Sequence, residues 1–185
     1  MSERSSWQRI ARRIRVPLGF IFAALFLWLA RPTWSLMLLS LLLVVPGLWL
    51  RGYAAGYVKK NAELTRTGPY AYTRNPLYLG SMMIAFGFAL ASGNWIIFLI
   101  LATGFLAIYL PTIRSEEEYL RSHFPGFDDY SRQVPRLLPR FTPAQNDLPP
   151  GRFSRERYLH HREYNALMGS AAIYGALAVR LLLRR

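Results

Sequence analysis

Two polar segments of the sequence hold most of the side chains that could do chemistry. The first, residues 64–80, reads LTRTGPYAYTRNPLYLG and sets Arg74 and Asn75 among three tyrosines. Asn75 precedes a proline that favours the start of a helix, so we expect its side-chain oxygen to cap that helix. An arginine beside exposed helix N–H groups suits a carboxylate or another anion. Tyrosines and arginines at a membrane interface would give the same pattern.

The second segment, residues 114–139, reads RSEEEYLRSHFPGFDDYSRQVPRLLP and has three consecutive glutamates near its start. Glu117 and Arg121 have the i,i+4 order that supports a helix, which we expect to end at Phe124-Pro125-Gly126. The glutamate carboxylates could accept the hydroxyls of a ribose or face a cationic ligand. They could equally form a helical turn that complements the helix dipole.

Several other chemistries find no support in the sequence. The chain has no cysteine, which excludes thiol nucleophiles, iron–sulfur clusters and thiolate zinc sites. His160, His161 and Glu163 lack metal-ligand spacing, so we predict no metal site. No glycine-rich nucleotide loop, P-loop or HExxH pattern is present, which excludes a soluble Rossmann-type enzyme.

The elements that must position these segments are long apolar runs. Of 185 residues, 52% are apolar and only 18% are charged. Uncharged runs at 16–30, 34–50, 77–92 and 95–113 predict four membrane helices. A weaker run at Tyr164–Leu183 includes Asn165, Ser170 and Arg180, but small residues such as Ala171 and Gly175 would allow close helix packing. We predict an all-α integral membrane bundle with about five transmembrane helices, although the last run could instead be a surface amphipathic helix.

The positive charge of the chain indicates how the bundle is oriented. The net charge is +13, and residues 1–15, 51–76 and 112–163 hold five, five and nine of the 23 lysines and arginines. If the first four helices cross the membrane, these regions share one side, which the positive-inside rule makes cytoplasmic. Because the charges flank apolar runs, we expect contact with anionic lipid headgroups and no nucleic-acid partner.

The two polar segments also resemble a known pair of motifs. GPYAYTRNPLYLG resembles the GPY…RHPxYxG segment of the isoprenylcysteine carboxyl methyltransferase and phospholipid methyltransferase families. EEEYLRSHFPGFDDYSRQVPRLLP resembles their EExxLxxxFGxxYxxYxxxVPRxxP segment. The resemblance covers about residues 60–140. It implies a membrane enzyme whose cytoplasmic loops and short helices enclose S-adenosylmethionine, with S-adenosylhomocysteine as product. The implied methyl acceptor is a lipid or lipidated molecule, such as an isoprenylcysteine carboxylate or a lipid amine.

The resemblance also implies roles for individual residues. Arg74 and Glu117 would be catalytic, Arg74 by holding a carboxylate and Glu117 by holding the ribose or the methionine amine. The implied cofactor-binding residues are Tyr70, Asn75, Pro76, Tyr78, Leu79, Gly80, Glu116, Glu117, Leu120 and Tyr130. Asn75 replaces the usual histidine of the family. An asparagine can donate a hydrogen bond to the cofactor but cannot accept a proton.

We interpret the whole chain, residues 1–185, as one membrane domain. It would comprise a basic amphipathic arm at 1–15, a helical hairpin at 16–50, the family-like core at 60–140 and a tail at 141–185. Two alternative functions stay open, namely a non-catalytic membrane adaptor on the same scaffold and a membrane sterol or lipid reductase that uses NADPH. Cofactor binding would separate them. The acceptor and the oligomeric state do not follow from the sequence.

Overall fold

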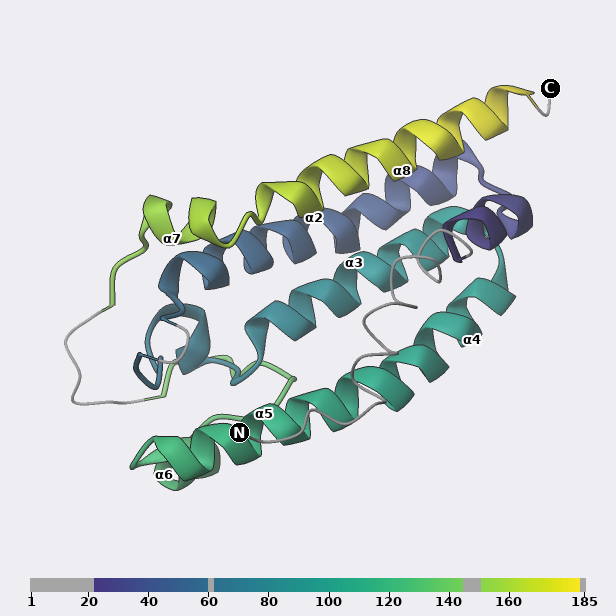
Figure 1. Cartoon of the computed structure of the whole chain (residues 1–185). Coiled ribbons are helices and arrows are strands. Elements are labelled where there is room, and N and C mark those ends of the chain that lie inside the picture. The colour runs from purple at the N-terminus through teal and green to yellow at the C-terminus, as the bar shows by residue number, and fades with distance from the viewer. Residues whose placement is uncertain (1–21, 60–61, 145–150, 184–185) are drawn as a thin grey trace, which may run out of the picture.

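The protein is built from helices that lie side by side (Figure 1). The computed structural model describes residues 22–59, 62–144 and 151–183, and all regular structure within them is helical. In the view of Figure 1 the order from top to bottom is α8 (Tyr164–Leu183), α2 (Trp34–Tyr57), α3 (Pro76–Ser92) and a long helix. This long helix is formed by α4 (Trp95–Gly104), η2 (Phe105–Tyr109) and α5 (Leu110–His123). Short helices lie at one end, namely η1 (Gly68–Ala71), α6 (Phe127–Gln133) and α7 (Arg155–His160). The all-α prediction is confirmed.

Three helices are long and apolar enough to cross a membrane, namely α2, the continuous helix Trp95–His123 and α8. The fourth apolar helix, α3, has 17 residues, and residues 22–29 form a further short helix. The predicted arm at 1–15 and residues 16–21 of the predicted span at 16–30 lie outside the described residues. Length and composition therefore favour a membrane-spanning α8 over the surface helix that the sequence left open.

Two helix boundaries differ from the predicted ones. The second run continues from residue 50 to Tyr57 despite Pro46 in its interior. The fourth run does not stop at Ile113 but continues to His123, where the predicted Phe124-Pro125-Gly126 stop is confirmed. A π-helical segment, η2, ends at Tyr109, two residues before Pro111 in this helix. Because proline has no N–H to donate, a local change in hydrogen bonding lets the helix pass through it.

The contact between α2 and α3 depends on glycines. A Cβ added at Gly80 would lie 2.7 Å from the Gly47 carbonyl oxygen, and one at Gly87 would lie 2.5 Å from Val44 Cγ2. Backbones approach this closely only where side chains are absent. The glycines therefore fix α3 against α2 along its length.

The last helix, α8, packs through polar contacts. Its Tyr174 hydroxyl lies 2.6 Å from Ser40 Oγ on α2. Arg180 donates to the carbonyl oxygens of Ala30 at 2.8 Å and Trp28 at 2.7 Å, which satisfies a charge that is costly in an apolar helix. The predicted close packing through small residues is wrong at Gly175, because a Cβ there would meet no atom of the structure within 4 Å.

Candidate functional site

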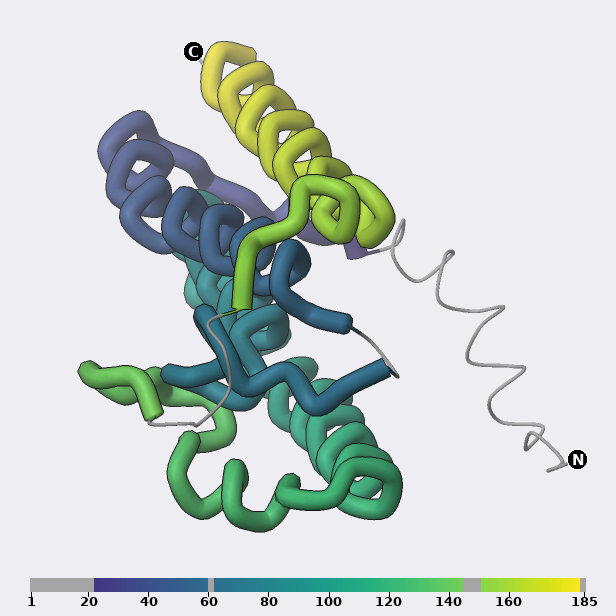
Figure 2. The backbone as a smooth tube through the Cα atoms, turned by 90° about the vertical axis from the view of Figure 1, so that its left-hand side faces the viewer, coloured from purple at the N-terminus to yellow at the C-terminus, as the bar shows by residue number. Residues whose placement is uncertain are grey.

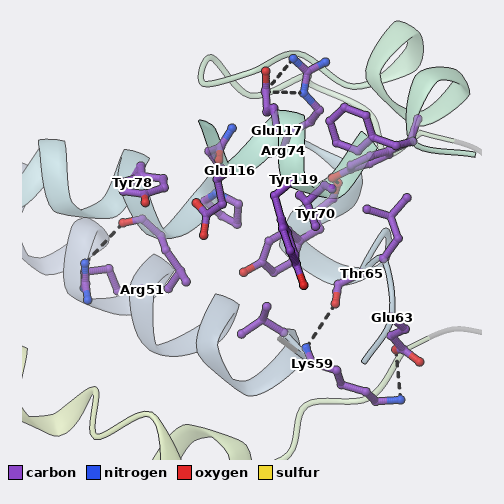
Figure 3. A pocket seen from close by; sticks show the side chains of 18 of the residues that line it. Arg51, Lys59, Glu63, Thr65, Tyr70, Arg74, Tyr78, Glu116, Glu117 and Tyr119 are labelled. Carbon is purple, nitrogen blue, oxygen red and sulfur yellow. Dashed lines mark hydrogen bonds and ion pairs between the residues drawn. The ribbon is translucent and has the colours of Figure 1, made fainter. Parts of the chain in front are cut away.

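The helix α5 diverges from α3 at one end of the bundle (Figures 1 and 2). A cavity of about 470 Å³ lies at that end. Its volume falls within the roughly 300–1,000 Å³ that small-molecule sites occupy. The C-terminal end of α2, the first turns of α3, the η1 loop and α5 form its walls (Figure 3). Six aromatic side chains line it, namely Tyr70, Tyr78, Tyr109, Tyr119, Phe127 and Tyr130.

The η1 loop is held in place from two sides. Gly68 has a φ of 61°, and the ring of Tyr57 occupies the space that a side chain there would need. On the other side, the Tyr130 hydroxyl donates to the Tyr70 carbonyl oxygen at 2.8 Å. Burial raises the pKa of both Tyr70 and Tyr130 above the ordinary value, so both phenols stay protonated at neutral pH.

Three charged side chains join the two motif segments. Arg74 donates to Glu117 Oε1 through Nε at 3.0 Å and lies 2.9 Å from it through Nη2. Arg136 reaches Glu117 Oε2 through Nη2 at 2.7 Å. Arg74 Nη1 also donates to the carbonyl oxygens of Ser131 at 2.6 Å and Val134 at 3.0 Å. The Arg74 guanidinium is therefore occupied by partners from this chain.

Glu117 is the centre of this arrangement, with only 6% of its surface exposed. It lies in the charged last turns of α5, beyond the apolar part of the helix. Burial would raise the pKa of Glu117, but the hydrogen bonds from Arg136 and Arg74 outweigh it and lower the pKa. The helix that the i,i+4 order of Glu117 and Arg121 predicts is present. The two side chains nevertheless have other partners, since Arg121 reaches Asp128 at 2.8 Å.

Asn75 occupies the position before α3 that the sequence predicts, but its side chain makes no capping hydrogen bond. The amide Nδ2 instead donates to the Arg136 carbonyl oxygen at 3.0 Å. This bond to the second motif segment takes the place of the expected helix cap. The sequence alone does not show that the second segment lies beside Asn75. Asn75 thus joins the same two segments as Arg74 does, and it also lines the cavity.

Among the described residues, the cavity lining contains one more carboxylate than cations. Its three cations all have a carboxylate partner: Arg51 pairs with Glu163 at 2.9 Å, Lys59 with Glu63 at 3.0 Å, and Arg74 with Glu117. Glu116 has no ion pair with any residue that the structure describes, and it lines the cavity beside Tyr78. Arg136 adds a cation behind Glu117, but it does not line the cavity and is 41% exposed, so solvent screens it.

Most of the predicted site residues meet at this cavity. The lining includes Tyr70, Arg74, Asn75, Pro76, Tyr78, Glu116, Glu117, Leu120 and Tyr130. Leu79 and Gly80 do not line it; both are buried, and Gly80 faces α2. Sequence reasoning missed Arg51, Ser81, Tyr109 and Glu163, which lie outside the motifs. Of these four residues, only Arg51 could have been suspected from the sequence, because it is the first charged residue after an apolar run.

This lining suits an organic cation. Tyrosine faces attract a cation through the negative face of the ring. The carboxylate of Glu116, which has no ion pair within the described residues, adds a negative charge that solvent partly screens. The chain as a whole carries +13, so the excess carboxylate in this cavity is a local departure from its surroundings. Neutral phenols and amides supply hydrogen bonds for a polar ligand.

Comparison with known proteins supports the resemblance. Residues 33–126, about half of the chain, match the phospholipid methyltransferase family. The nickel-cobalt-cadmium resistance protein NccN of Alcaligenes xylosoxydans xylosoxydans is 34% identical over 116 residues, or 62% of this chain and 54% of that protein. The cobalt-zinc-cadmium resistance protein CzcN of Cupriavidus metallidurans is 34% identical over 137 residues, or 69% of this chain and 62% of that protein.

A third relative is itself named as a methyltransferase. The protein-S-isoprenylcysteine O-methyltransferase of Schizosaccharomyces pombe is 32% identical over 84 residues, which cover 44% of this chain and 36% of that enzyme. No solved structure matches the chain. The match covers the α2–α3 pair, the η1 loop and the glutamates of α5, so the chain is a membrane protein that belongs to the phospholipid methyltransferase family.

Proposed function

We propose that the protein is a membrane methyltransferase that uses S-adenosylmethionine and methylates a lipid or lipid-like acceptor. The observation that supports this most is the cavity, which both motif segments line and in which carboxylates outnumber cations. Its aromatic faces and Glu116 fit a positively charged sulfonium. When bound, S-adenosylmethionine supplies a methyl group on that sulfonium.

The residues of this chain would bind and orient rather than exchange protons. Methyl transfer by in-line displacement depends mainly on holding the two reactants close and aligned. Glu116 and the tyrosine faces would attract the cation, while the neutral phenols of Tyr70 and Tyr130 maintain the shape of the cavity wall. Asn75 cannot accept a proton, so an acceptor that arrives already deprotonated suits this site.

Arg74 and Glu117 have a different role in this proposal from the catalytic one that the resemblance implies. Each fills the hydrogen-bonding capacity of the other, and Arg74 also holds two backbone carbonyls of the second motif segment. We therefore assign both as positioning residues. They would keep Glu116 and the η1 loop on opposite walls of the cavity.

A lipid acceptor is supported by the surface next to the cavity. Tyr109 lines the cavity at the end of η2, while its neighbours Leu106 and Ile108 are 58% and 64% exposed. Exposed apolar side chains on a membrane helix face lipid. An acyl or prenyl chain could thus lie along η2 with its polar end at the cavity.

The cavity end of the bundle is proposed to face the cytoplasm, as the distribution of basic residues predicts. The chain lacks cysteine, so a single introduced thiol gives an unambiguous label. In intact cells, a membrane-impermeant maleimide should spare Ser122→Cys near the cavity and react with Ser35→Cys at the opposite end of α2. The reverse pattern would contradict the orientation.

Methyl transfer is tested with the full chain in liposomes that contain phosphatidylethanolamine or a prenylcysteine analogue. With methyl-tritiated S-adenosylmethionine, we expect label in the extracted lipid or prenylcysteine, and much less with Glu116→Gln than with its exposed neighbour Glu118→Gln. Binding of S-adenosylmethionine without any transfer would support the adaptor instead. Binding of NADPH alone would support the reductase.

A further inference from the structure

A segment beyond the matched region contributes to the cavity wall. The family match ends at residue 126, yet Glu163, between α7 and α8, lines the cavity. Its carboxylate pairs with Arg51 of α2 through two contacts, Nη2 to Oε1 at 2.9 Å and Nε to Oε2 at 3.0 Å. Such a two-point arginine–carboxylate contact fixes both position and orientation.

The tail that carries Glu163 is anchored on α2. Gly56 leaves room for the ring of Phe153, which occupies the space where a side chain at Gly56 would lie. The Gly56 carbonyl oxygen accepts from Ser154 N at 3.0 Å and from Arg157 Nε at 2.7 Å. These contacts involve backbone atoms and a ring packed directly on Gly56, so the tail holds Glu163 in a defined place.

Without the negative charge of Glu163, the positive charge of Arg51 would be unpaired in the cavity wall. Arg51 also hydrogen-bonds to Ser81 Oγ on α3, so its guanidinium stays in the wall whether or not Glu163 is charged. The two side chains are only 25% and 11% exposed, which limits screening by water. Without the Glu163 charge, the part of the lining that the structure describes would hold three carboxylates and three cations, and its negative excess would vanish.

We propose that Glu163 adjusts this site for a cation by neutralising Arg51. The tail would thereby favour the sulfonium of S-adenosylmethionine over the uncharged thioether of S-adenosylhomocysteine, which has the same adenosine and amino-acid groups. The inference rests on the proposed function, because it concerns the same cavity. It makes the tail part of the ligand-binding site and not only a further helix of the bundle.

The test compares the affinities of the two ligands by calorimetry on full-length protein in detergent. With Glu163→Gln we expect S-adenosylmethionine to bind roughly tenfold more weakly, the order expected for a unit charge across a partly solvated cavity. S-adenosylhomocysteine should change less than about threefold, because its sulfur is neutral. Glu156→Gln, an exposed glutamate of the same tail, is the matched control and should bind both ligands as the wild type does.

A double variant separates charge from folding. Arg51→Gln/Glu163→Gln removes both charges, restores the negative excess and should return the ratio of the two affinities to the wild-type value. Equal weakening of both ligands by Glu163→Gln, or no change in either, would overturn the inference. If the wild type binds neither ligand, the proposed function itself fails. If Glu163→Gln cannot fold, it lacks the wild-type thermal transition and the other two variants decide. A wild-type ratio of the two affinities in both Glu163→Asp and the double variant would then support the inference. An altered ratio in either variant would overturn it.

Discussion

The two sides of α3 are built in opposite ways. Toward α2, glycines remove side chains until backbone touches backbone, with Gly80 against the Gly47 carbonyl and Gly87 against Val44. Toward α5, the helices diverge, and charged side chains from the loops extend between them (Figure 3). The contact of α3 with α2 at Gly80 and Gly87 leaves no room for even a methyl group, whereas a cavity of about 470 Å³ lies between the start of α3 and α5.

The α2 side of α3 thus makes the bundle rigid, and the α5 side provides the binding cavity. Close packing through small residues holds α3 in one position, and dispersion contacts favour that position without any polar partner. The ion pairs of the other side hold the cavity walls apart and at the same time give the cavity its charge. A substitution on the glycine side should therefore affect folding, whereas a substitution on the charged side should affect folding or binding according to whether the side chain is paired.

The largest effect on the charged side is expected for Glu117→Ala. This change leaves Arg74 and Arg136 without their shared carboxylate at a buried position, and breaking such a pair costs about 3–5 kcal/mol of folding free energy. Thermal unfolding in detergent, followed by circular dichroism, measures the loss. Glu118→Ala, on an exposed neighbour, should leave the transition in place. Equal transitions for the two variants would contradict a central role for Glu117.

A smaller loss of stability is expected on the glycine side. In Gly80→Ala the new methyl group would clash with the Gly47 carbonyl oxygen, and overpacking of this kind destabilises by about 1–3 kcal/mol. The matched control is Gly104→Ala, because a Cβ at Gly104 meets no atom of the structure within 4 Å. The same thermal measurement applies. If Gly80→Ala is as stable as the control, α2 and α3 do not pack as described.

Glu116→Gln should reduce binding and leave folding unchanged. Because Glu116 has no ion pair in the described chain, its charge is free to act on a ligand. We expect S-adenosylmethionine to bind about tenfold more weakly, which corresponds to about 1.4 kcal/mol, while S-adenosylhomocysteine changes little. Calorimetry with both ligands checks this. A large shift of the thermal transition would show instead that Glu116 is structural.

The smallest effect is expected at Asn75, which contributes one hydrogen bond between the motif segments. Asn75→Ala should lower the free energy of unfolding by about 1 kcal/mol, the usual contribution of such a bond. Asn75→His can still donate an N–H to the Arg136 carbonyl oxygen and should lose less. A stability of Asn75→Ala equal to that of the wild type would show that the bond does not form in solution.

The sequence predicted the helices and the two motif segments but not how they contact each other. Apolar runs were enough for α2, α3 and α8, because a run of that length has few alternatives in a membrane. The partners of Arg74 and Asn75 could not be predicted, since they lie 43 to 61 residues away and side-chain pairing depends on tertiary structure. Glu163 carried no signal for the same reason: its partner Arg51 is 112 residues away in the sequence.

The central claim is that the negatively charged, aromatic cavity binds S-adenosylmethionine. Calorimetric titration of the ligand into full-length wild-type protein, purified in detergent, tests it most directly, with NADPH as the comparison. We predict one S-adenosylmethionine bound per chain, tighter binding than that of S-adenosylhomocysteine, and no binding of NADPH. A folded, monodisperse protein that binds no S-adenosylmethionine, or that binds NADPH in its place, would contradict the account.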